Sequence, residues 1–365
     1  MRRIPDRKII LENGEEYCGY GFGRIEDRVL EIVFNTSMAG YQEILSDPSY
    51  TDQAVVMTYP IIGSYGMAED DYESARPSVG AMIVRDYNGE PSNFRSVCSL
   101  GEAMERFGIC GISGVDTRKL TRSIRDHGSR RALITDAGTS LEEGLGMIAN
   151  TPVPHDSVSR VSCRGINTYT GDGGIFHVVA IDCGMKMGIV RSLLARSCLV
   201  SVVPFDSSAE FIRSLKPDGI FISNGPGDPT DVPETISTVR SLIGYAPIFG
   251  ICLGHQIISL AYGGRTYKLK FGHRGGNHPV KDLVTGRIEI TSQNHSYAVD
   301  ASSLQGTGLE VTHLNLLDGT VEGTRCVSDR VFSVQYHPES CPGPRDSSHL
   351  FDRFIHMMQE ARYRA

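Results

Sequence analysis

A cysteine and a histidine–glutamate pair are the residues of this chain whose types and spacing could carry out nucleophilic catalysis. Cys252 lies in the sequence GICLGH at residues 250–255, which has the form G-x-S-x-G with cysteine in the nucleophile position. This pattern predicts a sharp, strained strand-to-helix turn, flanked by glycines because a Cβ would crowd it. A helix N-terminus favours the thiolate form of the sulfur. The N–H of Leu253 would then point to where an oxyanion forms.

A thiolate nucleophile needs a base, and the base needs a group that orients it. His337 and Glu339 follow an apolar stretch, with Pro338 between them. The proline restricts the backbone, so both side chains can project to one side, and the carboxylate can hold the tautomer of the imidazole. Taken singly, Cys252 could be a buried structural cysteine and His337 an ordinary histidine. Their joint occurrence favours a Cys-His-Glu triad.

A third feature is the loop at residues 223–229, which reads SNGPGDP. Read as a turn, this composition is ordinary. At the end of a parallel strand, however, Gly225 and Gly227 would let bare backbone approach a substrate. The chain contains no G-x-x-x-x-G-K-[ST] and no G-x-G-x-x-G at the start of a helix, so we expect that it does not itself bind ATP.

Two histidine-bearing stretches could be mistaken for metal ligands. They lie at residues 272–279 and 293–297. Neither offers an H-E-x-x-H pattern or a cysteine partner, so we expect no metal site.

The elements that must position these residues begin at residue 176, where strand and helix candidates alternate. Parallel strands buried on both faces are apolar throughout, and open sheets of this kind bind ligands at the carboxyl ends of their strands. We therefore expect an α/β fold, with a doubly wound, mostly parallel sheet over residues 175–365. The expected strands are 176–182, 199–205, 219–223, 247–251 and 331–336, and the expected helices are 185–196, 208–215, 232–243, 256–262 and 347–363.

The first 150 residues have a different pattern and predict a mixed α+β domain. Hairpins are expected over residues 8–34, a strand over 79–85, and helices over 99–107 and 116–125, with Ser99 and Asp116 as N-caps. Prolines, Ser/Thr and a Gly-Asp-Gly-Gly run favour an interdomain linker over residues 151–174.

Composition and charge argue against several classes of protein, namely nucleic-acid-binding, secreted and membrane-spanning ones. The 365 residues carry a formal net charge of −7; residues 1–150 hold 16 Lys and Arg against 23 Asp and Glu, and the remainder holds 20 of each sign. This distribution argues against nucleic acid as a partner. Nine cysteines without a C-x-x-C pair favour reduced thiols, and no secretory signal is visible, so we expect a cytoplasmic protein. Glycines and a proline interrupt the charge-free residues 241–264, so no membrane span is expected.

Taken together, the cysteine turn, the glycine loop and the His-x-Glu pair resemble the class I glutamine amidotransferases over residues 176–362. The first half resembles the N-terminal domain of the small, glutamine-hydrolysing subunit of carbamoyl phosphate synthetase. The sequences that carry this second resemblance are FNTSMAGYQEIL at residues 34–45, DPSY at 47–50 and DTRKLTR at 116–122, together with residues 271–281 and CPGP at 341–344.

The resemblance implies that Cys252 is the nucleophile, His337 the general base and acid, and Glu339 its partner. It implies that ammonia passes to a large synthetase subunit, which would hold the ATP and magnesium, and that the acidic first domain docks that partner. Where some family members have Gly-Phe and Arg-Asn, this chain has Ser296-Tyr297 and Met187-Gly188. The implied glutamine-binding residues are Ser49, Gly225, Gly227, Leu253, Gln256, Asn294, Ser296 and Tyr297.

Three other interpretations stay open at this point. The chain could be the glutaminase of another synthase, of the anthranilate or guanylate type, although those lack such a first domain. It could be a standalone cysteine hydrolase of γ-glutamyl bonds. It could also be a non-catalytic regulatory subunit, against which the intact Cys252, His337 and Glu339 argue.

Overall fold

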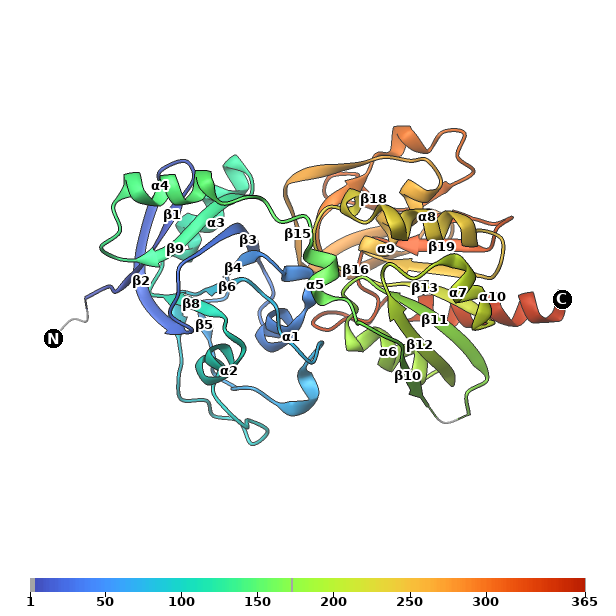
Figure 1. The fold of residues 1–365 in the computed structure, drawn as a ribbon, viewed down its shortest axis with the longest axis horizontal. Coiled ribbons are helices and arrows are strands. Elements are labelled where there is room, and N and C mark those ends of the chain that lie inside the picture. Colours follow the sequence, from blue (N-terminus) through green and yellow to red (C-terminus); the bar gives the residue numbers. More distant parts are fainter. Residues whose placement is uncertain (1–3, 172, 365) are drawn as a thin grey trace. The chain divides into compact units, whose positions relative to one another are not determined.

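The computed structural model describes residues 4–171 and 173–364 and is shown in Figure 1. The chain divides into two compact units. One holds the residues up to Pro154 together with Lys270–Arg274, and the other holds His155–Leu269 and the residues from Gly275 on. Of the expected domains and linker, residues 1–3, 172 and 365 lie outside the described residues.

The first unit is built on a closed β-barrel with the strand order β1-β2-β8-β6-β4-β3-β9 (Figure 1). A separate pair, β5 (Ile61–Ile62) and β7 (Asp86–Tyr87), runs parallel. The barrel strands are β1 (Arg7–Leu11), β2 (Glu16–Gly23), β3 (Arg28–Asn35), β4 (Gln53–Met57), β6 (Ala81–Ile83), β8 (Cys110–Ser113) and β9 (Arg130–Asp136).

Alternate residues of these strands enter two different apolar clusters, as the two-residue period of a strand requires. One cluster includes Ile32 and Val56 and packs with α3 (Thr117–His127); the other includes Val33 and Val55 and packs with α1 (Tyr41–Ser46) and α2 (Leu100–Phe107). A third, smaller cluster involves α4 (Leu141–Asn150).

Local signals predicted part of this unit correctly. Ser99 forms a capping box with Glu102 at the start of α2, and the Asp116 side chain accepts from the Lys119 N–H at the start of α3. The hairpin of β1 and β2 is confirmed. The expected pairing of β2 with β3 is wrong, because β2 pairs with β8 and β3 pairs with β9 and β4. Barrel closure, which joins strands far apart in sequence, decides these partners.

The second unit contains a ten-stranded sheet in the order β10-β12-β11-β13-β14-β19-β18-β16-β15-β17. Strands β12, β11, β13, β14 and β19 run parallel to one another, as expected. The sheet continues through antiparallel strands, so it is mixed rather than mostly parallel. Its strands are β10 (Asn167–Thr170), β11 (Phe176–Asp182), β12 (Cys198–Pro204), β13 (Gly219–Ile222), β14 (Ile248–Ile251), β15 (Thr266–Asp282), β16 (Ile288–Val299), β17 (Glu310–Asn315), β18 (Val321–Cys326) and β19 (Val331–Val334).

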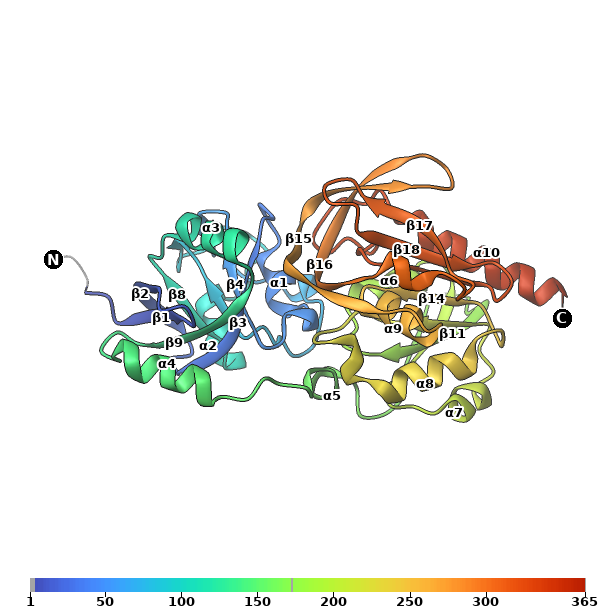
Figure 2. The ribbon, with the colours of Figure 1, turned by 90° about the horizontal axis from the view of Figure 1, so that it is seen from above.

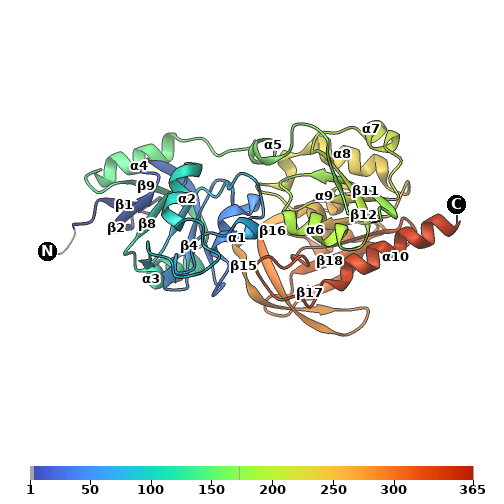
Figure 3. The ribbon, with the colours of Figure 1, turned by 90° about the horizontal axis from the view of Figure 1, so that it is seen from below.

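Helices cover both faces of the parallel strands. Helices α7 (Ala209–Ser214), α8 (Pro233–Leu242) and α9 (Leu253–Ala261) share one apolar cluster with the sheet (Figure 2). Helices α6 (Met187–Leu194) and α10 (His349–Arg364) pack in the cluster of the opposite face (Figure 3). This is the doubly wound arrangement that the strand–helix alternation predicts.

The expected linker region is partly regular. It contains α5 (Ser157–Val161) and β10, which is an edge strand of the ten-stranded sheet and pairs antiparallel with β12. The charge-free residues 241–264 include the end of α8, all of β14 and all of α9. Within the described part of the chain, no helix has both the length and the apolar character needed to cross a bilayer.

Candidate active site

Cys252 lies at the turn between β14 and α9, as the GICLGH pattern predicts. It has φ 54° and ψ −105°, a backbone conformation that L-residues rarely adopt and that costs on the order of 1–3 kcal/mol. A Cβ on Gly250 would lie 2.5 Å from Ile258 Cδ1, and one on Gly254 would lie 2.2 Å from the Ile222 carbonyl oxygen. The two glycines are therefore needed because the turn has no room for side chains.

His337 and Glu339 form the pair predicted at the corner that follows β19. Nδ1 of His337 lies 2.7 Å from Oε1 of Glu339, and both side chains are buried. A carboxylate is an acceptor, so this contact places the proton on Nδ1 and leaves Nε2 as the nitrogen for chemistry. The backbone N–H of His337 donates to the Ser292 carbonyl at 2.9 Å, which ties the corner to β16.

Lys186 completes this corner and is not among the residues that the sequence predicts for the site. Its Nζ lies 2.9 Å from Oε1 of Glu339, and its side chain is 2% exposed. The residue is the N-cap of α6, shortly after the end of β11. One signal was available: a lysine just beyond the carboxyl end of a buried parallel strand, where such sheets place their ligands. Lysine is almost never fully buried unless it is paired.

The charges of this corner support one another. Burial would raise the pKa of Glu339, but the ammonium of Lys186 and then the imidazolium of His337 outweigh burial and hold the pKa at about 2. Burial would likewise lower the pKa of His337, but the charges of Glu339 and of Cys252 raise it to about 10. The imidazole is therefore protonated at neutral pH, ready to act as an acid.

Cys252 and His337 interact electrostatically. The charge of Cys252 is among the causes that raise the pKa of His337. Its Sγ also lies 3.5 Å from the carbonyl oxygen of Asn294 on β16. The backbone of Cys252 is tied to β19 by its N–H, which donates to the Val334 carbonyl at 2.9 Å.

The glycine loop lies beside the helix that Cys252 begins. A Cβ on Gly225 would be 2.8 Å from Cδ2 of Leu253 and 2.1 Å from the Cys183 carbonyl oxygen, so only glycine fits there. Gly227 has a φ of 85°, in the left-handed region. Leu253 is the first residue of α9, where backbone N–H groups have no partner inside the helix. The arrangement offers N–H donors near the sulfur.

Most of the expected glutamine-binding residues lie in this same unit. Asn294, Ser296 and Tyr297 are on β16, and the Gln256 side chain on α9 donates to the Tyr297 carbonyl at 2.9 Å. Ser49 belongs to the first unit. It lies in a short 3₁₀ helix (Pro48–Tyr50), where its N–H donates to the Asp47 carboxylate at 2.9 Å. Its role in binding glutamine stays a prediction.

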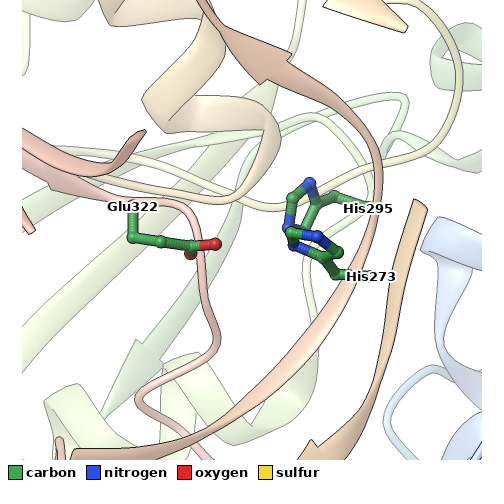
Figure 4. A group of neighbouring side chains, drawn as sticks. All are labelled: His273, His295 and Glu322. Atoms are coloured by element: carbon green, nitrogen blue, oxygen red, sulfur yellow. The ribbon is translucent and has the colours of Figure 1, made fainter. Parts of the chain in front are cut away.

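Figure 4 shows three side chains of metal-ligating type: His273, His295 and Glu322. Both ring nitrogens of His295 already make hydrogen bonds, at 2.7 Å to the Tyr297 carbonyl and 2.7 Å to Gln293 Oε1. A metal would have to displace one of these bonds. We therefore place no metal centre on this group.

Comparisons with known proteins agree with both halves of the sequence reasoning. Residues 179–357 match the family described as glutamine amidotransferase class-I, and residues 9–134 match the CPSase domain of the carbamoyl-phosphate synthase small chain.

Curated relatives match over nearly the full length. A carbamoyl phosphate synthase small chain of Fusobacterium nucleatum is 51% identical over 96% of this chain and 97% of its own. One of Staphylococcus epidermidis is 51% identical over 98% of this chain and 97% of its own. A carbamoyl phosphate synthase pyrimidine-specific small chain of Bacillus subtilis is 49% identical over 97% of this chain and 96% of its own.

Proposed function

Because the chain belongs to the carbamoyl phosphate synthase small chains, the glutamine-hydrolysing subunits of that enzyme, we propose that it releases ammonia from glutamine with Cys252, His337 and Glu339. The observation that carries this assignment is the buried chain of contacts from Lys186 through Glu339 to His337, together with the charge of Cys252, which helps to keep His337 protonated. Family membership sets aside the glutaminases of other synthases.

In the proposed reaction the Cys252 thiolate attacks the side-chain amide carbon of glutamine. The tetrahedral oxyanion accepts hydrogen bonds from the N–H of Leu253 and from backbone of the loop at Gly225 and Gly227. The His337 imidazolium protonates the leaving nitrogen, which departs as ammonia and leaves a glutamyl thioester.

The second half of the cycle hydrolyses the thioester. His337, now neutral, takes a proton from water, and the hydroxide attacks the thioester carbon. Glutamate leaves, the sulfur returns as thiolate, and His337 is again protonated. Throughout the cycle Glu339 keeps the imidazole ring of His337 oriented and stabilises its positive charge. Lys186 in turn keeps Glu339 ionised. The amino-acid end of the substrate would be held by residues of the second unit, namely Gln256, Asn294, Ser296 and Tyr297.

The ammonia is proposed to pass to a large synthetase subunit that binds ATP and magnesium. This chain itself is proposed to bind no cofactor. The excess of acid in residues 1–150 supports a role for the first unit in docking that subunit. If charge contributes to the contact, raising the salt concentration should weaken association of the two chains, because exposed charges are screened. Association that is independent of salt would argue against the acidic surface.

The function is tested by Cys252→Ala in the full chain assembled with its large partner. Synthesis of carbamoyl phosphate from glutamine should fall to background, whereas synthesis from added ammonia should remain. Cys18→Ala, at an exposed cysteine, is the matched control and should behave as the parent protein. Glutaminase activity retained by Cys252→Ala would reject the nucleophile. Full activity of the parent chain on γ-glutamyl substrates without any partner would favour a standalone hydrolase.

A further inference from the structure

Gln335 is a buried glutamine that none of the preceding roles uses. It follows β19 and lies two residues before the base His337, and its relative exposure is 0%. Its Oε1 accepts a hydrogen bond of 3.0 Å from Nε2 of Gln256. Gln256 is one of the residues expected to bind glutamine, so Gln335 is one contact removed from the proposed substrate.

The orientation of the Gln256 amide follows from its partners. Nε2 of Gln256 donates to the Tyr297 carbonyl at 2.9 Å as well as to Gln335 at 3.0 Å. A backbone carbonyl can only accept, so the atom facing Tyr297 must be the nitrogen of the amide, which settles the usual ambiguity between the two ends. Both hydrogens of this nitrogen are thereby used.

The other end of the Gln256 amide is open. Among the described residues, none donates to its Oε1, and this oxygen is not fully enclosed. A carbonyl oxygen presented in this way can accept a hydrogen bond from an ammonium or amide N–H but repels another acceptor. If the amide turned over, the NH₂ group would be presented instead, and an ammonium would find no acceptor.

We propose that Gln335 is a positioning residue that locks Gln256 with its carbonyl oxygen toward the substrate, and so selects a substrate that carries an α-ammonium group. The inference rests on the proposed glutaminase function and adds the source of its amino-acid specificity. Tyr297 anchors one hydrogen of Gln256 through the backbone, and Gln335 anchors the second through its side chain.

The Nε2 atom of Gln335 argues against a purely structural role for this side chain. Within the described part of the chain, its Nε2 is buried without a hydrogen-bond partner. A buried donor without an acceptor is unfavourable, and an apolar side chain of similar shape would avoid that loss. Gln335→Met is therefore expected to fold with a melting temperature close to that of the parent, while glutamine recognition suffers.

The test compares glutamine with glutaramate, which has the same amide and carboxylate but lacks the α-ammonium. In the full chain assembled with its partner, Gln335→Met should raise the KM for glutamine about 10-fold and change kcat little, as loss of one ordered hydrogen bond predicts. Its kcat/KM for glutaramate should stay near the parent value, so selectivity for glutamine falls. Gln359→Met, on the exposed face of α10, is the matched control for the same replacement.

A double-mutant cycle separates positioning from mere proximity to the base. If Gln335 acts through Gln256, then Gln335→Met in a Gln256→Met background should add no further rise in KM. Additive effects, or an equal loss of kcat/KM for both substrates, would overturn the proposal. If Gln335→Met fails to fold, Gln335→Glu carries the test: it keeps an acceptor oxygen and should keep the selectivity for glutamine, and loss of that selectivity would also overturn the proposal. A parent protein without glutaminase activity would instead reject the proposed function itself.

Discussion

The turn at Cys252 and the corner at His337 lie after neighbouring parallel strands, yet they are held in different ways. Backbone geometry positions Cys252: a positive φ, and glycines at 250 and 254 where a Cβ would clash. Side-chain charge positions His337, through Glu339 and then Lys186. The first arrangement depends on six consecutive residues. The second depends on a lysine about 150 positions away in the chain.

This difference predicts how each half of the site responds to substitution. Strain in the turn is a local cost that the surrounding strands and helix must hold in place. The corner instead buries three ionisable groups, whose desolvation is offset only while each keeps its partner. Replacements in the turn should therefore act through sterics, and replacements in the corner through charge.

The largest effect is expected for His337→Gln, which removes the proposed acid and base of the corner while leaving the turn intact. The kcat for glutamine hydrolysis should fall about 10³-fold or more, as for loss of a triad histidine. Steady-state kinetics and single-turnover formation of the thioester measure it. His349→Gln, at a partly exposed histidine, is the control. Normal turnover by His337→Gln would remove this residue as the base.

Lys186→Met removes the ammonium group that pairs with Glu339 in the corner. Loss of one partner from a buried ion pair should lower the free energy of unfolding by about 3 kcal/mol, and the pKa of Glu339 should rise because its strongest opposing charge is gone. Urea denaturation measures the first effect. Adding Glu339→Gln should recover part of the lost stability, since no buried carboxylate is then left unpaired. A single variant as stable as the parent would show that the pair contributes nothing.

Gly254→Ala tests the turn through the same quantity, the free energy of unfolding. The new Cβ would lie 2.2 Å from a backbone oxygen, so the turn must shift, at a cost of about 2 kcal/mol in unfolding free energy. Gly146→Ala is the control: this glycine lies in helix α4 with nothing within 4 Å of the added Cβ, so the same replacement should stabilise the protein slightly. Equal effects of the two variants would mean that the turn is not crowded.

The pH dependence of the stability difference between the parent and a corner variant should report on the corner. The raised pKa of His337 means that its contribution is complete below pH 6.5 and is lost as the pH rises through about 10, by at most about 1.4 kcal/mol per pH unit. The lowered pKa of Glu339 means that its contribution is present above pH 4.5 and is lost as the pH falls through about 2. The stability difference between the parent and His337→Gln should thus shrink from pH 6.5 upward. A constant difference would contradict this prediction.

The smallest effect is expected for the difference in stability between Cys252→Gly and Cys252→Ala. Both variants lack the sulfur, but only glycine adopts φ 54° and ψ −105° without strain. Cys252→Gly should therefore be the more stable of the two by about 1 kcal/mol, although glycine usually destabilises a folded chain. Thermal or urea unfolding measures the difference. A less stable Cys252→Gly would show that the turn is not strained.

Local and periodic features were predictable. The strand–helix alternation from β11 to α9 indicated the doubly wound part, because parallel strands buried on both faces are apolar throughout. Ser99 and Asp116 marked their helix starts because N-caps act on the adjacent turn. The mixed character of the sheet, the pairing of β3 with β4 and the edge strand β10 were not predictable, since strand partners are chosen across long stretches of chain.

The sequence by itself determined that a cysteine would sit on a crowded turn, since Gly250 and Gly254 specify that geometry within a few residues. It also determined that His337 and Glu339 would meet, because Pro338 lies between them. Only the tertiary structure decided that Lys186 would complete the corner and that Gln335 would hold Gln256. The physical reason is that burial strengthens charges and hydrogen bonds, and burial exists only after separate segments have packed together.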